Sequence, residues 1–304
     1  MAHPASYEIL SLPDIRLFHN PPSSASPTPI ITISLHRPSA RNSFTEQMGQ
    51  SLISAFNLLS TDPRVRVIIL TSSDPTNTVF CAGMDLNAIP STRSSFASDT
   101  RQTHRDMGGR VALAIYNCQK PVIAALNGSA VGVGIAMTLA ASIRVASEGA
   151  KVGFVFARRG IVMEACSSFF LPRLIGAGKA MHLVTTGGVY PATHPLVRDL
   201  FGEIVPAEEV LKRALEIAQE VCQHCSGVSV ALMKDMIFRG GGSPEEAHAL
   251  ESKVLYDMFR AKDFKEGVES FKQKRAPRFE ATLEEDGPKV WPWWGWMTVP
   301  LGKM

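Results

Sequence analysis

Residues 120–142 read KPVIAALNGSAVGVGIAMTLAAS, and this stretch decides the fold. It opens with β-branched and other apolar residues, which predict a strand buried on both faces. Glycines and small residues follow, and they indicate a tight turn that leads into a closely packed helix. A strand, a glycine-rich turn and a helix in this order are typical of an α/β protein. We therefore expect free backbone N–H groups where this turn enters the helix.

Residues 80–86, FCAGMDL, have the same form, because an apolar stretch again ends at small residues and a glycine. Backbone N–H groups at a helix start attract an anion, helped by the helix dipole. Two such groups directed at one point would stabilise an oxyanion, each by about 3–4 kcal/mol. The alternative is that the small residues only permit close packing. A dinucleotide-binding turn is not expected, since Met137 stands where that fingerprint has its third glycine.

Strands come before helices along the rest of the chain. Apolar, β-branched stretches predict strands at residues 29–38, 65–72, 143–147 and 151–156. Ser43 and Glu46 have the spacing of a capping box, which predicts the start of a helix. Beyond about residue 206 the periodicity is helical, and it predicts helices at residues 208–224, 228–237, 244–259 and 262–274.

The composition of the 304 residues narrows the class of protein. A hydrophobic share of 45% excludes disorder for most of the chain, because it supplies enough apolar surface to bury. No apolar run reaches the roughly 18 residues that span a bilayer, so no membrane segment is expected. A net charge of +3 without a concentrated basic face does not favour nucleic-acid binding. The first 29 residues lack the pattern of a signal peptide.

The cysteines and histidines give no sign of a metal site. Five scattered cysteines indicate reduced thiols in an intracellular protein. Cys222 and Cys225 form a C-x-x-C pair, but a zinc or redox interpretation needs a second pair or a strand-to-helix setting. We interpret them as packed or idle thiols. The eight histidines show no metal-ligand spacing, so no metal is expected.

The two glycine-bearing stretches, at this spacing, resemble the crotonase (enoyl-CoA hydratase/isomerase) superfamily. Three further stretches agree with it. They resemble the family's first strand and adenine loop, its acid/base segment and its C-terminal helix, and they lie at residues 33–45, 152–176 and 265–279. The resemblance covers about residues 29–279. It implies an α/β fold with a crotonase-type ββα spiral core and a C-terminal helical oligomerisation region, acting on an acyl-CoA thioester.

The resemblance assigns the two oxyanion N–H groups to Met84 and Val133. Hydratases of the family carry two catalytic glutamates, and Ala136 and Phe156 take those positions here. Addition of water by two glutamates therefore has neither of its usual groups. We expect Ala136 and Phe156 to form a dry wall that raises the basicity of a nearby carboxylate.

The segment around Glu164 resembles that of Δ3,Δ2-enoyl-CoA isomerases, which carry a single glutamate at this position. The resemblance implies that Glu164 moves a proton from C2 to C4 of a 3-enoyl-CoA through a dienolate. One alternative is a hydratase or dehydratase of fatty-acid or specialised metabolism that uses Glu164 alone. A more remote alternative is a crotonase-fold protein that only binds its ligand. From the residues alone, Glu164 would also suit a helix start on the surface.

The resemblance also implies the residues that bind the substrate. Those near the adenine, the pantetheine or the thioester are Ala40, Arg41, Asn42, Ala82, Gly83, Asp85, Leu86 and Gly132. Asp85 is expected mainly to cap the helix that begins there. On the last helix, Phe271 and Lys274 match positions that reach the nucleotide of a neighbouring subunit. Coenzyme A is part of the substrate, so no separate cofactor is expected.

The family forms trimers that often pair into hexamers, which implies a homotrimer or a hexamer here. The expected compartment is the cytosol, with the peroxisome as the alternative. The chain divides into a variable N-terminal segment (1–28), the spiral core (29–207), a helical trimerisation region (208–279) and a tail (280–304). This tail holds all four tryptophans: Trp291, Trp293, Trp294 and Trp296. We expect it to dock on its own or a neighbouring subunit, for example over the acyl pocket.

Overall fold

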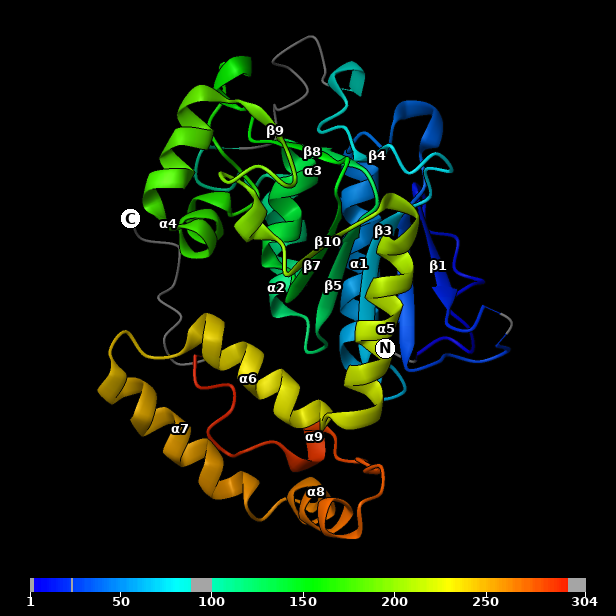
Figure 1. Cartoon of the computed structure of the whole chain (residues 1–304), viewed down its shortest axis with the longest axis vertical. Helices are drawn as coiled ribbons and strands as arrows, with labels where there is room; N and C mark the ends of the chain where they lie inside the picture. Colours follow the sequence, from blue (N-terminus) through cyan, green and yellow to red (C-terminus); the bar gives the residue numbers. More distant parts are fainter. Residues whose placement is uncertain (1–2, 23, 89–99, 295–304) are drawn as a thin grey trace. The chain divides into compact units, whose positions relative to one another are not determined.

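The computed structural model describes residues 3–22, 24–88 and 100–294 (Figure 1). The chain forms two compact units, Met1–Ala218 and Gln219–Met304. The boundary between them lies inside helix α5, Val210–His224. In its described part the first unit mixes strands and helices, whereas the second is helical.

A six-stranded sheet forms the centre of the first unit. Its order is β1-β2-β3-β5-β7-β10, and all neighbours are parallel except β1 and β2. The strands are β1 Ile15–His19, β2 Ile30–Leu35, β3 Val67–Ser72, β5 Val122–Leu126, β7 Ile143–Ser147 and β10 Glu203–Val205. Every residue of β2, β3 and β5 is buried, which explains their continuous apolar sequences. Helices α1 (Glu46–Thr61) and α2 (Met107–Asn117) pack against each other beside this sheet.

A second, four-stranded sheet in the same unit has the order β4-β6-β8-β9. Its strands are β4 Val79–Cys81, β6 Ser129–Val131, β8 Lys151–Gly153 and β9 Val189–Pro191. The first three are parallel, so the turns that follow β4 and β6 leave the sheet at one edge. The short helix α3, Val133–Ala136, begins directly after β6, and the long helix α4, Ser167–Thr186, follows β8.

One local expectation changes in the structure. The cap of α1 is Thr45, whose hydroxyl accepts a hydrogen bond from Met48 N at 3.0 Å, so the predicted capping box of Ser43 and Glu46 is wrong. The Ser43 hydroxyl and carbonyl instead accept bonds from the Arg37 guanidinium. The N-terminal segment also contributes structure, because β1 lies within it and pairs with β2.

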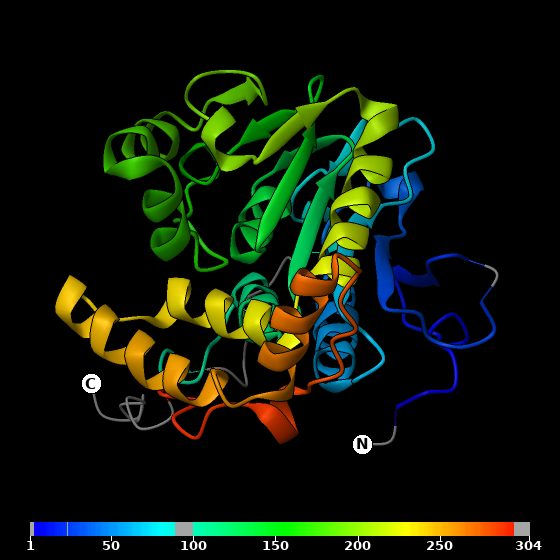
Figure 2. The same cartoon turned by 60° about the horizontal axis from the view of Figure 1, so that its bottom comes forward.

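In the second unit, three helices and the tail share a core. The helices of this unit after α5 are α6 Gly227–Arg239, α7 Pro244–Met258, α8 Lys262–Gln273 and α9 Leu283–Asp286. The segment after α9 runs along α6 and α7 (Figures 1 and 2), where Trp293 is buried with Val228, Leu232 and Val254. The tail thus docks on its own chain as far as residue 294, while Trp296 lies outside the described residues.

Indole N–H groups fix the tail in this position. Trp291 Nε1 donates to Asp235 Oδ2 and Trp293 Nε1 donates to the Arg239 carbonyl, both at 2.9 Å. The Arg239 guanidinium also lies 4.0 Å from the centre of the Trp294 ring. Trp291 and Trp293 therefore bury apolar surface without leaving the indole N–H unpaired.

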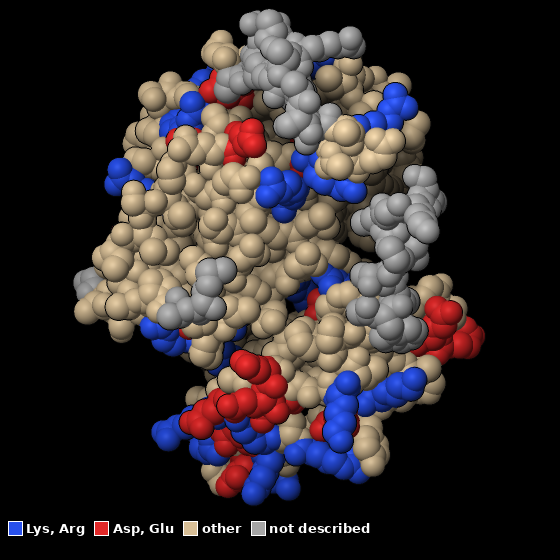
Figure 3. All heavy atoms as spheres, turned by 180° about the vertical axis from the view of Figure 1, so that it is seen from behind, with Lys and Arg blue, Asp and Glu red and all other residues tan. Residues whose placement is uncertain are grey.

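The surface seen in Figure 3 carries Lys and Arg side chains interspersed with Asp and Glu, and large areas of it are uncharged. The ion pairs of the described residues include Arg275 with Glu266 and Lys262 with Asp286. Among the described residues, no helix is long and apolar enough to cross a membrane.

Candidate active site

The two glycine turns predicted from the sequence lie side by side. Strands β4 and β6 pair in parallel, with Cys81 opposite Ala130, and each ends in a glycine with positive φ. Gly83 has φ 98° and Gly132 has φ 57°, a region that residues with a side chain rarely adopt. A Cβ atom built on Gly132 would lie 4.0 Å from the Cα of Gly83. The residues that follow them, Met84 and Val133, are therefore neighbours.

The backbone N–H of Met84 faces away from Phe44, the residue with which Met84 pairs. Met84 forms a parallel bridge with Phe44, in which Phe44 N donates to the Gly83 carbonyl at 2.8 Å and Asp85 N donates to the Phe44 carbonyl at 2.9 Å. In such a bridge the N–H of the middle residue points to the opposite side. The Met84 N–H is thus available to an acceptor outside this pairing.

The backbone N–H of Val133 is the first of helix α3. Gly132 N donates to the Gly153 carbonyl at 2.9 Å, and the Gly132 carbonyl accepts from Ala136 N at 3.0 Å. These bonds fix the turn on both sides of Val133, whose own N–H belongs to the first helical turn and has no acceptor within the helix. Val133 itself is buried. The arrangement suits two amides that bind one oxygen.

Glu164 lies beside Val133 in the folded chain. A Cβ atom built on Gly108, in the first turn of α2, would lie 2.0 Å from Glu164 Oε2 and 3.0 Å from Val133 Cγ2. The carboxyl of Glu164 thus occupies the space that a side chain at residue 108 would fill. Its other oxygen, Oε1, is buried and has no hydrogen-bond partner in the described structure. A carboxyl oxygen in this state is free to exchange a proton with a ligand.

The surroundings of Glu164 favour its neutral form. Burial, and then the hydrogen bond and negative charge of Asp106, raise the pKa of Glu164 to about 8. The backbone after Glu164 is held in place, since the Glu164 carbonyl accepts from both N and Oγ of Ser167. Ala165 and Cys166 follow with φ 54° and 55°, a strained conformation for residues with side chains.

The positions that hold two glutamates in the family's hydratases are apolar and buried. Ala136 is fully buried in α3. Phe156 is 5% exposed, and its carbonyl accepts from Arg159 N and Ile161 N in the loop that leads to Glu164. Neither residue supplies a proton-transfer group, whereas the Glu164 carboxyl lies beside Val133.

The loop predicted to face the adenine packs against the first glycine turn. The Arg41 carbonyl accepts from Ala82 N at 3.2 Å, and Arg41 and Asn42 have φ 54° and 50°. Asn42 is buried and its Oδ1 accepts from Arg37 N, whereas Ala40 is half-buried. The segments at positions 40–42 and 82–86 therefore lie side by side.

Asp85 has the structural role expected of it. Its carboxylate accepts from Asn87 N at 3.1 Å and so caps the short turn that begins at Leu86. It also pairs with the Arg37 guanidinium at 3.0 Å, which lowers the pKa of Asp85. This ion pair ties the residues after β4 to the loop that follows β2.

Phe271 and Lys274 lie in the second unit. Phe271 is 84% exposed on α8, and Lys274 ends that helix with φ 54°. Both side chains are accessible in one copy of the chain, and their predicted contact with a nucleotide stays a prediction.

Asp106 and Gly108 were not predicted as site residues, although both lie beside Glu164. Asp106 caps α2 by accepting from Gly109 N at 2.5 Å. The sequence signal was the run Asp-Met-Gly-Gly, an N-cap residue followed by two glycines inside a helix. Nothing in that run indicated which distant segment would meet it.

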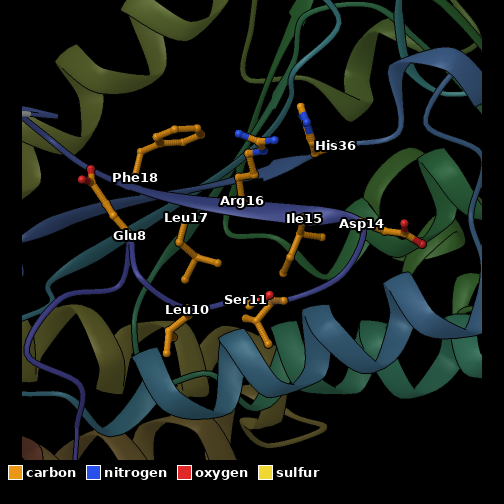
Figure 4. Close-up of a pocket in the computed structure, with 10 residues that line it drawn as sticks. Glu8, Leu10, Ser11, Asp14, Ile15, Arg16, Leu17, Phe18 and His36 are labelled. Carbon is orange, nitrogen blue, oxygen red and sulfur yellow. The ribbon is translucent and has the colours of Figure 1, made fainter.

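A separate pocket is lined by the N-terminal segment, including β1, and by His36 (Figure 4). Its lining includes Leu10, Ser11, Asp14, Arg16 and His36. None of the predicted site residues lines it. Among the described residues, no group of three or more His, Cys, Asp or Glu side chains is placed to hold a metal ion.

A family model described as enoyl-CoA hydratase/isomerase matches residues 26–282. The chain belongs to this family. The enoyl-CoA hydratase ACTT3 of Alternaria alternata is 49% identical over 259 residues, which is 84% of each chain. The (E)-benzylidenesuccinyl-CoA hydratase of Thauera aromatica is 31% identical and covers 81% of this chain and 94% of its own length.

Solved structures of the family agree with the fold. A probable enoyl-CoA hydratase/isomerase from Mycobacterium abscessus superposes with a TM-score of 0.75 at 33% identity, covering 83% of this chain and 95% of its own. An enoyl-CoA hydratase from Bacillus anthracis superposes with a TM-score of 0.76 at 27% identity, and the match covers 88% of this chain and 100% of its own. The predicted crotonase fold is therefore confirmed, and the chain is an enzyme of a family that acts on acyl-CoA thioesters.

Gly108→Ala is expected to lower kcat/KM by about 100-fold, because the new methyl group would displace the Glu164 carboxyl by an ångström or more. The fold should tolerate the change, since alanine favours a helix more than glycine does. Gly178→Ala in α4 is the matched control, because a Cβ there meets nothing within 4 Å. Steady-state kinetics of both variants, with circular dichroism, test this. Equal kinetics for the two would contradict the position given to Glu164.

Proposed function

We propose that this chain is an enoyl-CoA hydratase that adds water reversibly to the C2–C3 double bond of an acyl-CoA thioester. The observation that carries this proposal is the Glu164 carboxyl, which lies beside the Val133 side chain and has one buried oxygen without a hydrogen-bond partner. The hydratases that are 49% and 31% identical to it support water, rather than another group, as the nucleophile.

One carboxyl is enough for the proton transfers of hydration. Ionised Glu164 takes a proton from water as the water oxygen bonds to C3, and the electrons of the double bond move to the thioester oxygen. The Met84 and Val133 N–H groups stabilise that oxyanion. The now neutral Glu164 then returns the proton to C2, which restores the carbonyl. A pKa of about 8 keeps both forms of Glu164 accessible near neutral pH.

A 1,3-shift of the double bond is the second candidate, and the apolar side chains of Ala136 and Phe156 favour it. Ionised Glu164 would remove a proton from C2 of a 3-enoyl-CoA and return it to C4 of the dienolate. The same two N–H groups would hold the negative charge. This reaction needs a dry site, because water would compete for the carboxylate. The two candidates share every residue and differ in whether water enters.

Isotope labelling separates them. The purified full chain is incubated with trans-2-enoyl-CoA and, separately, with trans-3-enoyl-CoA in ¹⁸O water, using short, long and aromatic acyl groups. Labelled 3-hydroxyacyl-CoA from the 2-enoyl substrate is the expected result. Unlabelled, conjugated product from the 3-enoyl substrate alone would favour isomerisation. No turnover of either substrate, with the protein folded by circular dichroism, would overturn both.

The pH dependence of the reaction follows from the raised pKa of Glu164. Because catalysis in either candidate begins with ionised Glu164, kcat/KM is expected to rise with pH and level off above about 8. A carboxyl with an ordinary pKa would give a plateau from about pH 6. Initial rates between pH 5 and 10 measure this. A flat profile across that range would contradict the raised pKa of Glu164.

We propose that coenzyme A is bound as part of the substrate by the adjacent segments at residues 40–42 and 82–86, with no separate cofactor. We also propose a homotrimer or hexamer in the cytosol or the peroxisome. Exposed apolar side chains on the helices of the second unit support association, and they include Met233, Ile237, Leu255, Phe259 and Phe264. Light scattering of the purified protein measures the number of subunits.

A further inference from the structure

Two successive glycines at the start of α2 leave room for two carboxyl groups. A Cβ on Gly108 would meet Glu164 Oε2 at 2.0 Å, and a Cβ on Gly109 would meet Asp106 Oδ2 at 2.7 Å. Glycine inside a helix costs about 0.5–1 kcal/mol relative to alanine, so two in one turn are unfavourable for the helix itself. The space that they leave is filled by the acid/base and by the residue that caps the helix.

Asp106 connects that helix to the segment that carries Glu164. Its Oδ1 accepts from Gly109 N at 2.5 Å and from Ala165 N at 3.4 Å, across 59 residues of sequence. Ala165 has φ 54° and Cys166 has φ 55°, so two residues in succession have a backbone that is strained for their type. A bond from the first of them to Asp106 helps to hold this conformation, and with it the direction of the Glu164 side chain.

We propose that Asp106 is the positioning residue of the active site: it ties the Glu164 segment to α2 and places a carboxylate beside the acid/base. The proposal rests on the proposed role of Glu164 as the acid/base, and it adds the residue that sets the position of Glu164. In this proposal Asp106 makes no bond to the substrate and acts only through Glu164.

Three ionisable groups face Glu164 in the described structure: Asp106 at the start of α2, Cys81 at the end of β4 and Cys166 in the same loop. Burial raises the pKa of the Cys81 thiol to about 12 and also raises that of Cys166. Both thiols are therefore neutral around pH 7, and Asp106 is the carboxylate that acts on Glu164. Its effect is to keep the proton on Glu164 to a higher pH.

Asp106→Asn tests this, because asparagine caps a helix about as well as aspartate but carries no charge. The midpoint of the pH profile of kcat/KM is expected to fall by about one unit. Asp106→Ala, which removes the cap and the bond to Ala165 as well, is expected to lower kcat at least tenfold at every pH. Asp74→Asn is the matched control, since Asp74 also accepts several backbone bonds but lies in another loop. It should leave the profile unchanged.

A direct titration keeps the test independent of turnover. In protein with ¹³C-labelled glutamate carboxyls, the Glu164 resonance is assigned by its absence in Glu164→Gln and followed from pH 5 to 10. A lower midpoint in Asp106→Asn supports the proposal. An unchanged midpoint and pH profile in Asp106→Asn, with Glu164→Gln inactive, would overturn it and leave the proposed function intact. If Glu164→Gln keeps full activity, the proposed function and this inference both fail.

Discussion

Glu164→Gln is expected to lower turnover of an enoyl-CoA by about 10²–10⁴-fold, the range found when a positioned acid/base is removed. Glutamine fills the space beside Gly108 as glutamate does, but it cannot accept or return a proton. Substrate binding should change little, because the carboxyl is proposed to act on the reacting atoms and not on coenzyme A. Steady-state kinetics at pH 8 measure the loss in kcat, and KM within about threefold of the parent protein is expected.

The same variant is expected to stabilise the fold at alkaline pH. A carboxyl whose pKa rises from 4.5 to about 8 binds its proton more tightly in the folded state than in the unfolded chain. Stability is therefore lost as the pH rises through this range, and the loss is complete above about pH 8. Glutamine removes that penalty, so the free energy of unfolding should exceed the parent's by about 1–3 kcal/mol at pH 9 and match it at pH 4. Lower stability than the parent at pH 9 would contradict the burial of this group.

Trp293→Ala is expected to lower the free energy of unfolding by about 3–5 kcal/mol. Trp293 is 3% exposed and packs with Val228, Leu232 and Val254, so its removal opens the core of the second unit. The variant also leaves the Arg239 carbonyl without the indole donor. Urea unfolding followed by circular dichroism measures the change.

Two further substitutions separate packing from hydrogen bonding in that core. Trp293→Phe keeps an aromatic ring and loses the N–H, so a smaller loss of about 1 kcal/mol is expected. Phe271→Ala, at a side chain that is 84% exposed, should change stability by less than about 0.5 kcal/mol. Equal stability for Trp293→Ala and Phe271→Ala would show that the tail is not part of the core.

The tail extends this unit beyond the family's matched region. The family model ends at residue 282, yet Trp291 and Trp293 are bonded to Asp235 and Arg239 of α6. The concentration of tryptophans at the C-terminus is thus explained, up to residue 294, by packing against the chain's own helices. Its extension over the acyl pocket stays a prediction.

The sequence by itself determined the features whose causes are local. Gly83 and Gly132 mark the two turns because only glycine readily adopts the φ values found there. The continuous apolar strands marked a sheet covered on both faces, and the order of motifs marked the family. Met84, Val133 and Glu164 were assigned through the resemblance to the family, before any contact was known.

The tertiary structure decided what depends on contacts between distant segments. Asp106 and Gly108 surround Glu164 because α2 packs beside α3, and no local pattern encodes that neighbour. Thr45 rather than Ser43 caps α1 because Arg37, six residues before Ser43, binds the Ser43 oxygens. The raised pKa of Glu164 likewise comes from burial and from a charge that lies far away in the sequence. Periodicity reports the conformation of a segment, whereas proximity between segments exists only once the chain has packed.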